Sequence, residues 1–109
     1  PSADEGRNPQ ELSDDNHLLQ QVHRASVLCN NASLEGVGEP TEVALMLAVN
    51  DRVIIKSAYE RLLEVPFDSE RRMMSVVMRR ILSSSDMELY SKGAIEAILP
   101  KCSTVALYD

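Results

Sequence analysis

The segment LEVPFDSERRMMSVVMRRILSSSDMELYSKG (residues 63–93) decides the fold, because it carries strand patterns separated by polar breaks. Leu63, Val65 and Phe67 alternate with other residues, as the inward positions of a strand do. Valine-rich MMSVVMRR and alternating MELYSK follow as two further strands. The polar connections are DSER (68–71) and ILSSSD (81–86), and the second is expected to join a hairpin. Consecutive strands with short connections predict an antiparallel meander.

Within the third strand, Met87 and Leu89 are expected on one face, and Glu88, Tyr90 and Lys92 on the other. Helices are expected on both sides of the meander in sequence. The elements predicted outside it are a helix over 14–29 capped by Ser13, a largely buried helix starting at Pro40, a short helix within 51–60, a helix from Ala94 that stops near Pro100, and a last strand over 104–109. This order predicts an α+β fold with an antiparallel sheet flanked by helices. Residues 1–12 are expected to be a flexible tail or loop, and 13–109 one domain.

Composition excludes several functions. The chain has 109 residues and a net charge of −6, which disfavours coating nucleic acid, because phosphates need an excess of Lys and Arg. There is no run of apolar residues long enough to span a membrane and no secretory signal. Cys29 and Cys102 form no CxxC pair, so both are expected to be unpaired and structural, in a reducing compartment. We expect no metal site.

No familiar catalytic motif is present, and three local clusters remain. Each has an ordinary structural explanation. Gly38-Glu39-Pro40-Thr41-Glu42 is typical of a helix start. Phe67 is the only Phe, and a lone aromatic is usually core, while the arginines of the hairpin are usually a solvated face balanced by acids. Lys92-Gly93 is a weak motif alone, although a cation before a helix start suits phosphate.

Together and in this order, the three clusters are more specific. Gly38-Glu39-Pro40-Thr41-Glu42, the segment 66–76 and Lys92-Gly93-Ala94-Ile95-Glu96 resemble the nucleotide-binding domain of cation-transporting P-type ATPases, whose patterns are G[DE]PTE, PF(x)SERKxMS and KGAPE. The resemblance covers residues 16–103. It is greater to the calcium-pump-like and magnesium-transporter-like groups than to heavy-metal pumps.

The resemblance implies an ATP site, and each role is carried over by position. Phe67 would stack on adenine, Lys92 would line the deep end of the pocket, and Glu42 would accept a hydrogen bond near the adenine amino group. Arg72, where the family commonly has Lys, would approach the ribose or the phosphates. Met74, Gly93 and Ala94 would shape the pocket wall.

The resemblance also implies how such a domain works. It would hold ATP, with Mg²⁺ carried by the nucleotide, and present the γ-phosphate to an acceptor Asp in another domain. Its partners would be the phosphorylation and actuator domains of a parent pump, at the cytosolic face of a membrane, without direct membrane contact. The chain contains no DKTGT acceptor motif, so no catalytic residue is expected and the domain alone should not hydrolyse ATP.

Two departures and two alternatives accompany this interpretation. Ile95 replaces the proline of KGAPE, and the family's later phosphate-contacting arginine would lie past Asp109, so the domain is expected to be truncated at its C-terminal end. The first alternative is a non-catalytic interaction or regulatory module with the same fold and little nucleotide binding. The second is a single-stranded nucleic-acid binder using Phe67 and the arginines, which the net charge disfavours.

Overall fold

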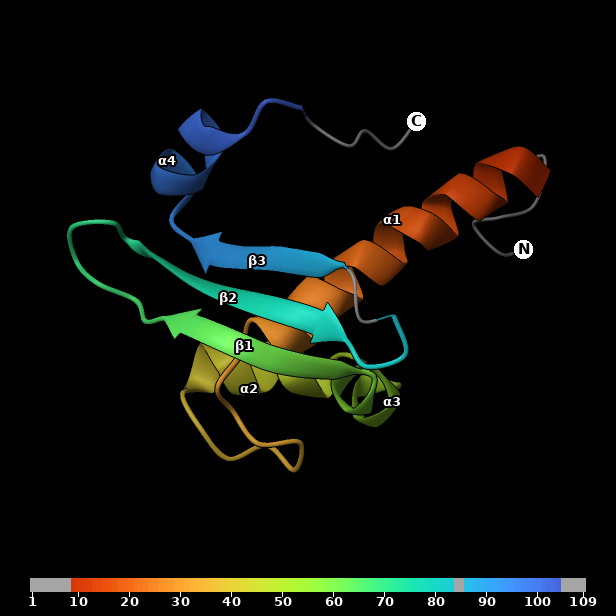
Figure 1. Cartoon of the computed structure of the whole chain (residues 1–109), viewed down its shortest axis with the longest axis horizontal. Coiled ribbons are helices and arrows are strands. Elements are labelled where there is room, and N and C mark those ends of the chain that lie inside the picture. Colours follow the sequence, from red (N-terminus) through yellow and green to blue (C-terminus); the bar gives the residue numbers. More distant parts are fainter. Residues whose placement is uncertain (1–8, 84–85, 105–109) are drawn as a thin grey trace.

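A three-stranded antiparallel sheet forms the centre of the computed structural model, which describes residues 9–83 and 86–104. The strand order is β1-β2-β3, and helices precede and follow the sheet in sequence (Figure 1). The elements are α1 (Pro9–Leu28), α2 (Pro40–Leu47), α3 (Arg52–Ser57), β1 (Tyr59–Val65), β2 (Met73–Arg80), β3 (Met87–Gly93), α4 (Ile95–Ile98) and the 3₁₀-helix η1 (Leu99–Lys101). The predicted α+β class and the meander are confirmed.

The core lies between the sheet and α1, which passes behind the strands in Figure 1. Met74, Val76 and Met78 alternate along β2 and are all buried, so one face of the central strand is apolar. They pack against Leu28 and Cys29 at the end of α1. Val27, Met46 and Val49 form a second buried cluster, which joins α1 to α2. The sheet is therefore covered on this face by the C-terminal end of α1.

The other face of the sheet is exposed at Met87 and Leu89 of β3, whereas Met73 and Ser75 of β2 are buried on it. Met87 and Leu89 share this face, as predicted, and the exposed fraction of Leu89 is 67%. Glu88, Tyr90 and Lys92 lie on the helix-covered face instead, where Tyr90 packs against the core. Polar side chains usually face solvent and apolar ones face the core, and β3 has the reverse arrangement. The polar groups of these three residues can lie on the covered face because each has a hydrogen-bond or ion-pair partner there.

Three element boundaries or burials differ from prediction. The first helix begins at Pro9, not at residue 14, so Ser13 is not its N-cap and residues 9–12 are not a loop. A proline at the first helical position has no amide hydrogen to lose, which is also why α2 begins at Pro40. The helix α2 is less buried than expected: only Met46 is fully enclosed, because α2 packs against α1 on one side. Phe67 follows β1 and is not part of it.

Among the described residues, no helix is long and apolar enough to cross a membrane.

The last helix, α4, gives way to a 3₁₀ turn at Leu99, close to the predicted stop at Pro100. The strand predicted over 104–109 falls almost entirely on residues 105–109, which lie outside the described residues.

The two cysteines differ in burial. Both are free, as predicted, but Cys102 is exposed, so the predicted structural role is supported by burial only for Cys29. Cys29 is fully buried, and burial raises the pKa of its thiol. Because the thiolate is the reactive form, we expect a thiol-specific reagent to modify Cys102 quickly and Cys29 only after unfolding.

A disulfide-exchange dye reports this directly by absorbance. The native protein should release one equivalent of dye anion quickly, and the protein in denaturant should release two. Cys102→Ser should abolish the fast phase. Two fast thiols in the native protein, or none without reductant, would contradict the prediction.

Candidate functional site

The centre of the candidate site is an ion pair between two of the three sequence clusters. Glu42 lies in the first turn of α2 and Lys92 near the end of β3, 50 residues apart. The Nζ atom of Lys92 donates to Oε2 of Glu42 at 2.7 Å. Met74, paired with Lys92 in the register of β2 and β3, lies buried beside this pair. The structure thus brings together three of the seven residues singled out in the sequence.

Glu42 is held by its neighbours from several sides. The backbone N–H of Glu42 donates to Oε2 of Glu39, the N-cap of α2, and this bond lowers the pKa of Glu39. The backbone N–H of Asn31 donates to the same Glu42 oxygen that Lys92 reaches, at 3.1 Å. Among the described residues, no donor reaches Oε1 of Glu42. One carboxylate oxygen is therefore fixed by the protein, and the other can still accept a hydrogen bond.

The Asn30 side chain connects the backbone of Glu42 to the end of α1. It is 2% exposed, and all of its amide atoms are used. Its Nδ2 donates to the carbonyl oxygens of Ser26 at 2.9 Å and Glu42 at 2.8 Å. Its Oδ1 accepts from the backbone N–H of Ala32 at 2.8 Å. A single buried side chain thus joins α1, the following loop and α2.

Gly93 allows the closest backbone approach in this region. A Cβ placed on Gly93 would lie 2.4 Å from the carbonyl oxygen of Arg72 and 2.7 Å from Cα of Met73. The same carbonyl accepts a hydrogen bond from the N–H of Ala94 at 3.1 Å. Gly93 and Ala94 therefore pack on the start of β2, which adds a structural role to the expected one of shaping the pocket wall.

Phe67 and Arg72 lie in the loop between β1 and β2, and among the described contacts neither touches the Glu42–Lys92 pair. Phe67 is 61% exposed, which leaves its ring face accessible. Arg72 has a positive φ of 59° and forms an ion pair with Glu96 of α4. The pKa of Glu96 is lowered by its own backbone N–H at the helix start and by Arg72.

Arg71, which the sequence analysis did not assign to the site, supports this loop. Its guanidinium bonds the Asp68 carboxylate and the carbonyl oxygens of Val65, Pro66 and Met73. The backbone N–H of Arg71, followed by its side chain, lowers the pKa of Asp68. Arg71 is thus occupied by contacts within its own loop, whereas Arg72 pairs with Glu96 on the surface. Arg72 and Lys101 line a hollow of about 510 Å³ beside α4, together with Glu70 and Glu96.

The arginines of the hairpin are balanced by acids, as the ordinary explanation predicted. The ion pairs are Arg71–Asp68, Arg72–Glu96, Arg79–Glu60 and Arg80–Glu88. They spread along the sheet and do not form one basic stripe, which disfavours a surface for single-stranded nucleic acid.

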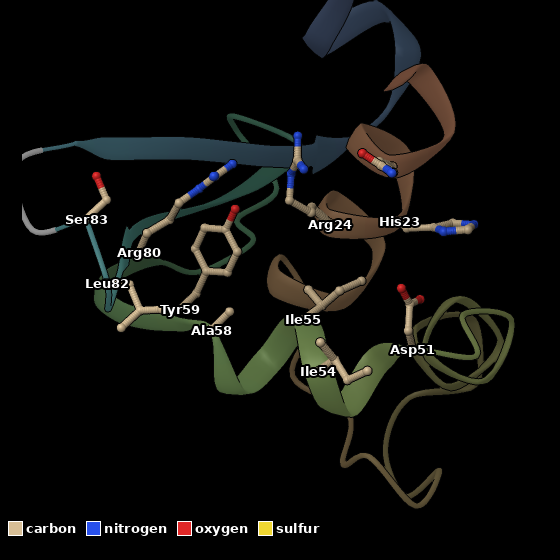
Figure 2. A pocket seen from close by; sticks show the side chains of 11 residues that line it. His23, Arg24, Asp51, Ile54, Ile55, Ala58, Tyr59, Arg80, Leu82 and Ser83 are labelled. Carbon is tan, nitrogen blue, oxygen red and sulfur yellow. The ribbon is translucent and has the colours of Figure 1, made fainter. Parts of the chain in front are cut away.

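A separate cavity of about 440 Å³ lies at the opposite end of β2 (Figure 2). Its walls include Arg24, Ile54, Tyr59, Arg80 and Leu82. The Arg80 guanidinium lies 5.5 Å from the centre of the Tyr59 ring and bonds Glu88. None of the seven predicted residues lines this cavity, so it is not part of the candidate site. Within the described residues, no group of three or more His, Cys, Asp or Glu could hold a metal ion.

Comparison with known proteins assigns the family. The sequence profile described as "P-type ATPase, cytoplasmic domain N" matches residues 18–109. Calcium-transporting ATPase 1 of Bacillus cereus is 36% identical over 103 residues, which cover 86% of this chain and 11% of that protein. The calcium-transporting ATPase of Bacillus subtilis is 34% identical over 116 residues, covering 94% and 12%. Calcium-transporting ATPase type 2C member 2 of Rattus norvegicus is 37% identical over 96 residues, covering 82% and 10%.

The chain thus spans about a tenth of the length of the curated relatives it matches. The matched region contains all three sequence clusters and every element from α2 to η1. On this evidence the chain belongs to the family of P-type ATPase cytoplasmic N domains.

Proposed function

We propose that this domain binds ATP and presents its γ-phosphate to an acceptor aspartate in another domain of a cation-transporting P-type ATPase. The observation that carries the proposal is the Lys92–Glu42 ion pair, because it joins two of the family motifs at one place. The parent protein would be an ion pump with this domain at the cytosolic face of a membrane, next to its phosphorylation and actuator domains.

Each side chain has a role suited to part of the nucleotide. The exposed ring of Phe67 offers a face on which adenine can stack. The unpartnered Oε1 of Glu42 accepts from the adenine amino group, and Lys92 orients Glu42 while adding positive charge. Met74, Gly93 and Ala94 form part of the wall of the nucleotide pocket. Arg72 exchanges Glu96 for the ribose or the phosphates, and any Mg²⁺ arrives with the nucleotide.

Titration of the domain with ATP tests this function. One stacking ring and few free cations predict weak binding, with a Kd of about 1 mM. Phe67→Ala should weaken ATP binding by roughly tenfold, because base–aromatic stacking contributes about 1–3 kcal/mol. Leu89→Ala is the matched control, since it removes an equally exposed apolar side chain from the open sheet face.

NMR chemical-shift titration follows such weak binding residue by residue. Shifts should concentrate at Glu42, Phe67 and Lys92 in the wild type and in Leu89→Ala. Equal ATP affinity in Phe67→Ala, or no binding by the wild type, would contradict the proposal. The second outcome would favour the alternative, an interaction module that keeps the fold without binding nucleotide.

A further inference from the structure

Arg61 connects β1 to the end of α1, far from it in sequence. Arg61 lies where the register of β1 and β2 shifts, between Arg61 and Leu63. Its Nη2 donates to the carbonyl oxygens of Leu28 at 2.8 Å and Asn30 at 3.0 Å. The last turn of α1 has no basic residue of its own, so Arg61 supplies both the missing donors and the positive charge at this helix end.

The other side of the guanidinium closes a ring of three side chains. Nη1 of Arg61 donates to Oδ1 of Asn31 at 2.7 Å and to Oε1 of Glu64 at 3.3 Å. Nδ2 of Asn31 donates to Oε2 of Glu64 at 3.0 Å. Because an arginine only donates and a carboxylate only accepts, this ring allows Asn31 a single amide orientation. Asn31 is exposed, yet both ends of its side chain are fixed.

Asn31 connects this ring to Glu42, the carboxylate of the candidate site. The backbone N–H of Asn31 donates to Oε2 of Glu42, the oxygen that Lys92 also reaches. Arg61 also bonds the Asn30 carbonyl oxygen, which belongs to the same planar peptide unit as this N–H, so Arg61 helps to fix where the N–H points. The N–H in turn helps to fix where Glu42 points. Arg61 itself makes no bond to Glu42 or Lys92 among the described residues.

We propose that Arg61 is a positioning residue for base recognition, acting through Asn31 on Glu42. The inference rests on the proposed function, in which Oε1 of Glu42 accepts from the adenine amino group. Arg61 does not touch the nucleotide. Its loss frees the Asn30–Asn31 peptide unit, whose N–H bonds Glu42, and leaves Glu42 less well aimed. The cost falls on ligands whose base donates to Glu42, and much less on the stacking and phosphate contacts.

Comparing ATP with inosine triphosphate separates positioning from general damage. Inosine carries a carbonyl oxygen where adenine carries the amino group, so it cannot donate to Glu42 from that position. We expect the wild type to bind ATP about tenfold more tightly than inosine triphosphate, and Arg61→Met to lose roughly fivefold in ATP affinity. The affinity for inosine triphosphate should stay almost unchanged. Arg61→Lys keeps the positive charge but lacks the planar guanidinium, so its ATP affinity should lie between those of the wild type and Arg61→Met.

Two variants keep the test informative if Arg61→Met folds poorly. Asn31→Ala breaks the ring but leaves the bonds from Arg61 to Leu28 and Asn30, so it should lower the ATP preference by less than Arg61→Met does. Arg79→Met is the control, because it removes an arginine paired with Glu60 that lies outside the ring. Thermal melting confirms that each variant is folded.

The outcomes distinguish the two proposals. A wild type that binds both nucleotides equally would overturn the role of Glu42 and this inference with it. A wild type that prefers ATP, with Arg61→Met and Asn31→Ala keeping that preference, would overturn the role of Arg61 alone. Equal loss of both nucleotides in the two variants would show general damage and would also overturn it.

Discussion

Replacing Gly93 with alanine is expected to destabilise the domain by about 3 kcal/mol, the upper part of the range for overpacking. The added methyl group would lie 2.4 Å from the Arg72 carbonyl oxygen and 2.7 Å from Cα of Met73. Both are backbone atoms, so neither can move aside as a flexible side chain would. Relief requires β2 and β3 to separate at this end, which also breaks the bond from Ala94 to Arg72.

Urea denaturation followed by circular dichroism measures this change. The same loss should lower the melting temperature by more than about 10 °C for a domain of this size. Leu89→Ala on the same strand is the control and should change stability by less than about 1 kcal/mol, because Leu89 is exposed. A Gly93→Ala protein as stable as the wild type would show that the close approach is not required by the fold.

Asn30→Ala is expected to lower the free energy of unfolding by a similar amount, about 3 kcal/mol, or roughly one for each hydrogen bond lost. The substitution leaves the Ser26 and Glu42 carbonyls and the Ala32 N–H without their buried partner. It also frees the start of α2 from the end of α1. ATP affinity should therefore fall even where the variant remains folded, because Glu42 loses its backbone anchor.

Asn50→Ala is the matched control for this change. Asn50 is an exposed asparagine in the turn after α2, and its loss should leave both stability and ATP affinity close to those of the wild type. Denaturation curves and nucleotide titration are measured on the same samples. An Asn30→Ala protein with wild-type stability would show that these three bonds contribute nothing net.

Local pattern explains what could be predicted about the fold. The strands β2 and β3 and their hairpin connection follow from alternation and polar breaks, and α2 begins at a proline for a reason confined to one residue. Prediction failed where two local signals competed. Ser13 suits a helix N-cap, yet the helix begins at Pro9. Phe67 continues the alternation of β1, yet the loop that Arg71 holds follows Val65 directly.

The candidate site could be predicted only through ordered motifs. Glu42, Lys92 and Met74 were singled out, and the structure places them together. Asn31, Arg61 and Glu64 were not, because nothing in their local sequence distinguishes them from ordinary surface residues. Arg61 reaches residues about 30 positions away, and no local period encodes such a distance.

By itself, then, the sequence determined the fold class, the strands β2 and β3 and the family, since these follow from local periods and from short motifs in order. The tertiary structure alone decided which sheet face is covered, which oxygen of Glu42 is bonded by Lys92 and Asn31, and which arginine of the loop bonds the loop's own carbonyl oxygens. These depend on side chains that meet across 6 to 50 positions of the chain, at Arg71, Arg61 and Lys92. A hydrogen bond is set by distance and direction in space, and neither is defined until the backbone has folded.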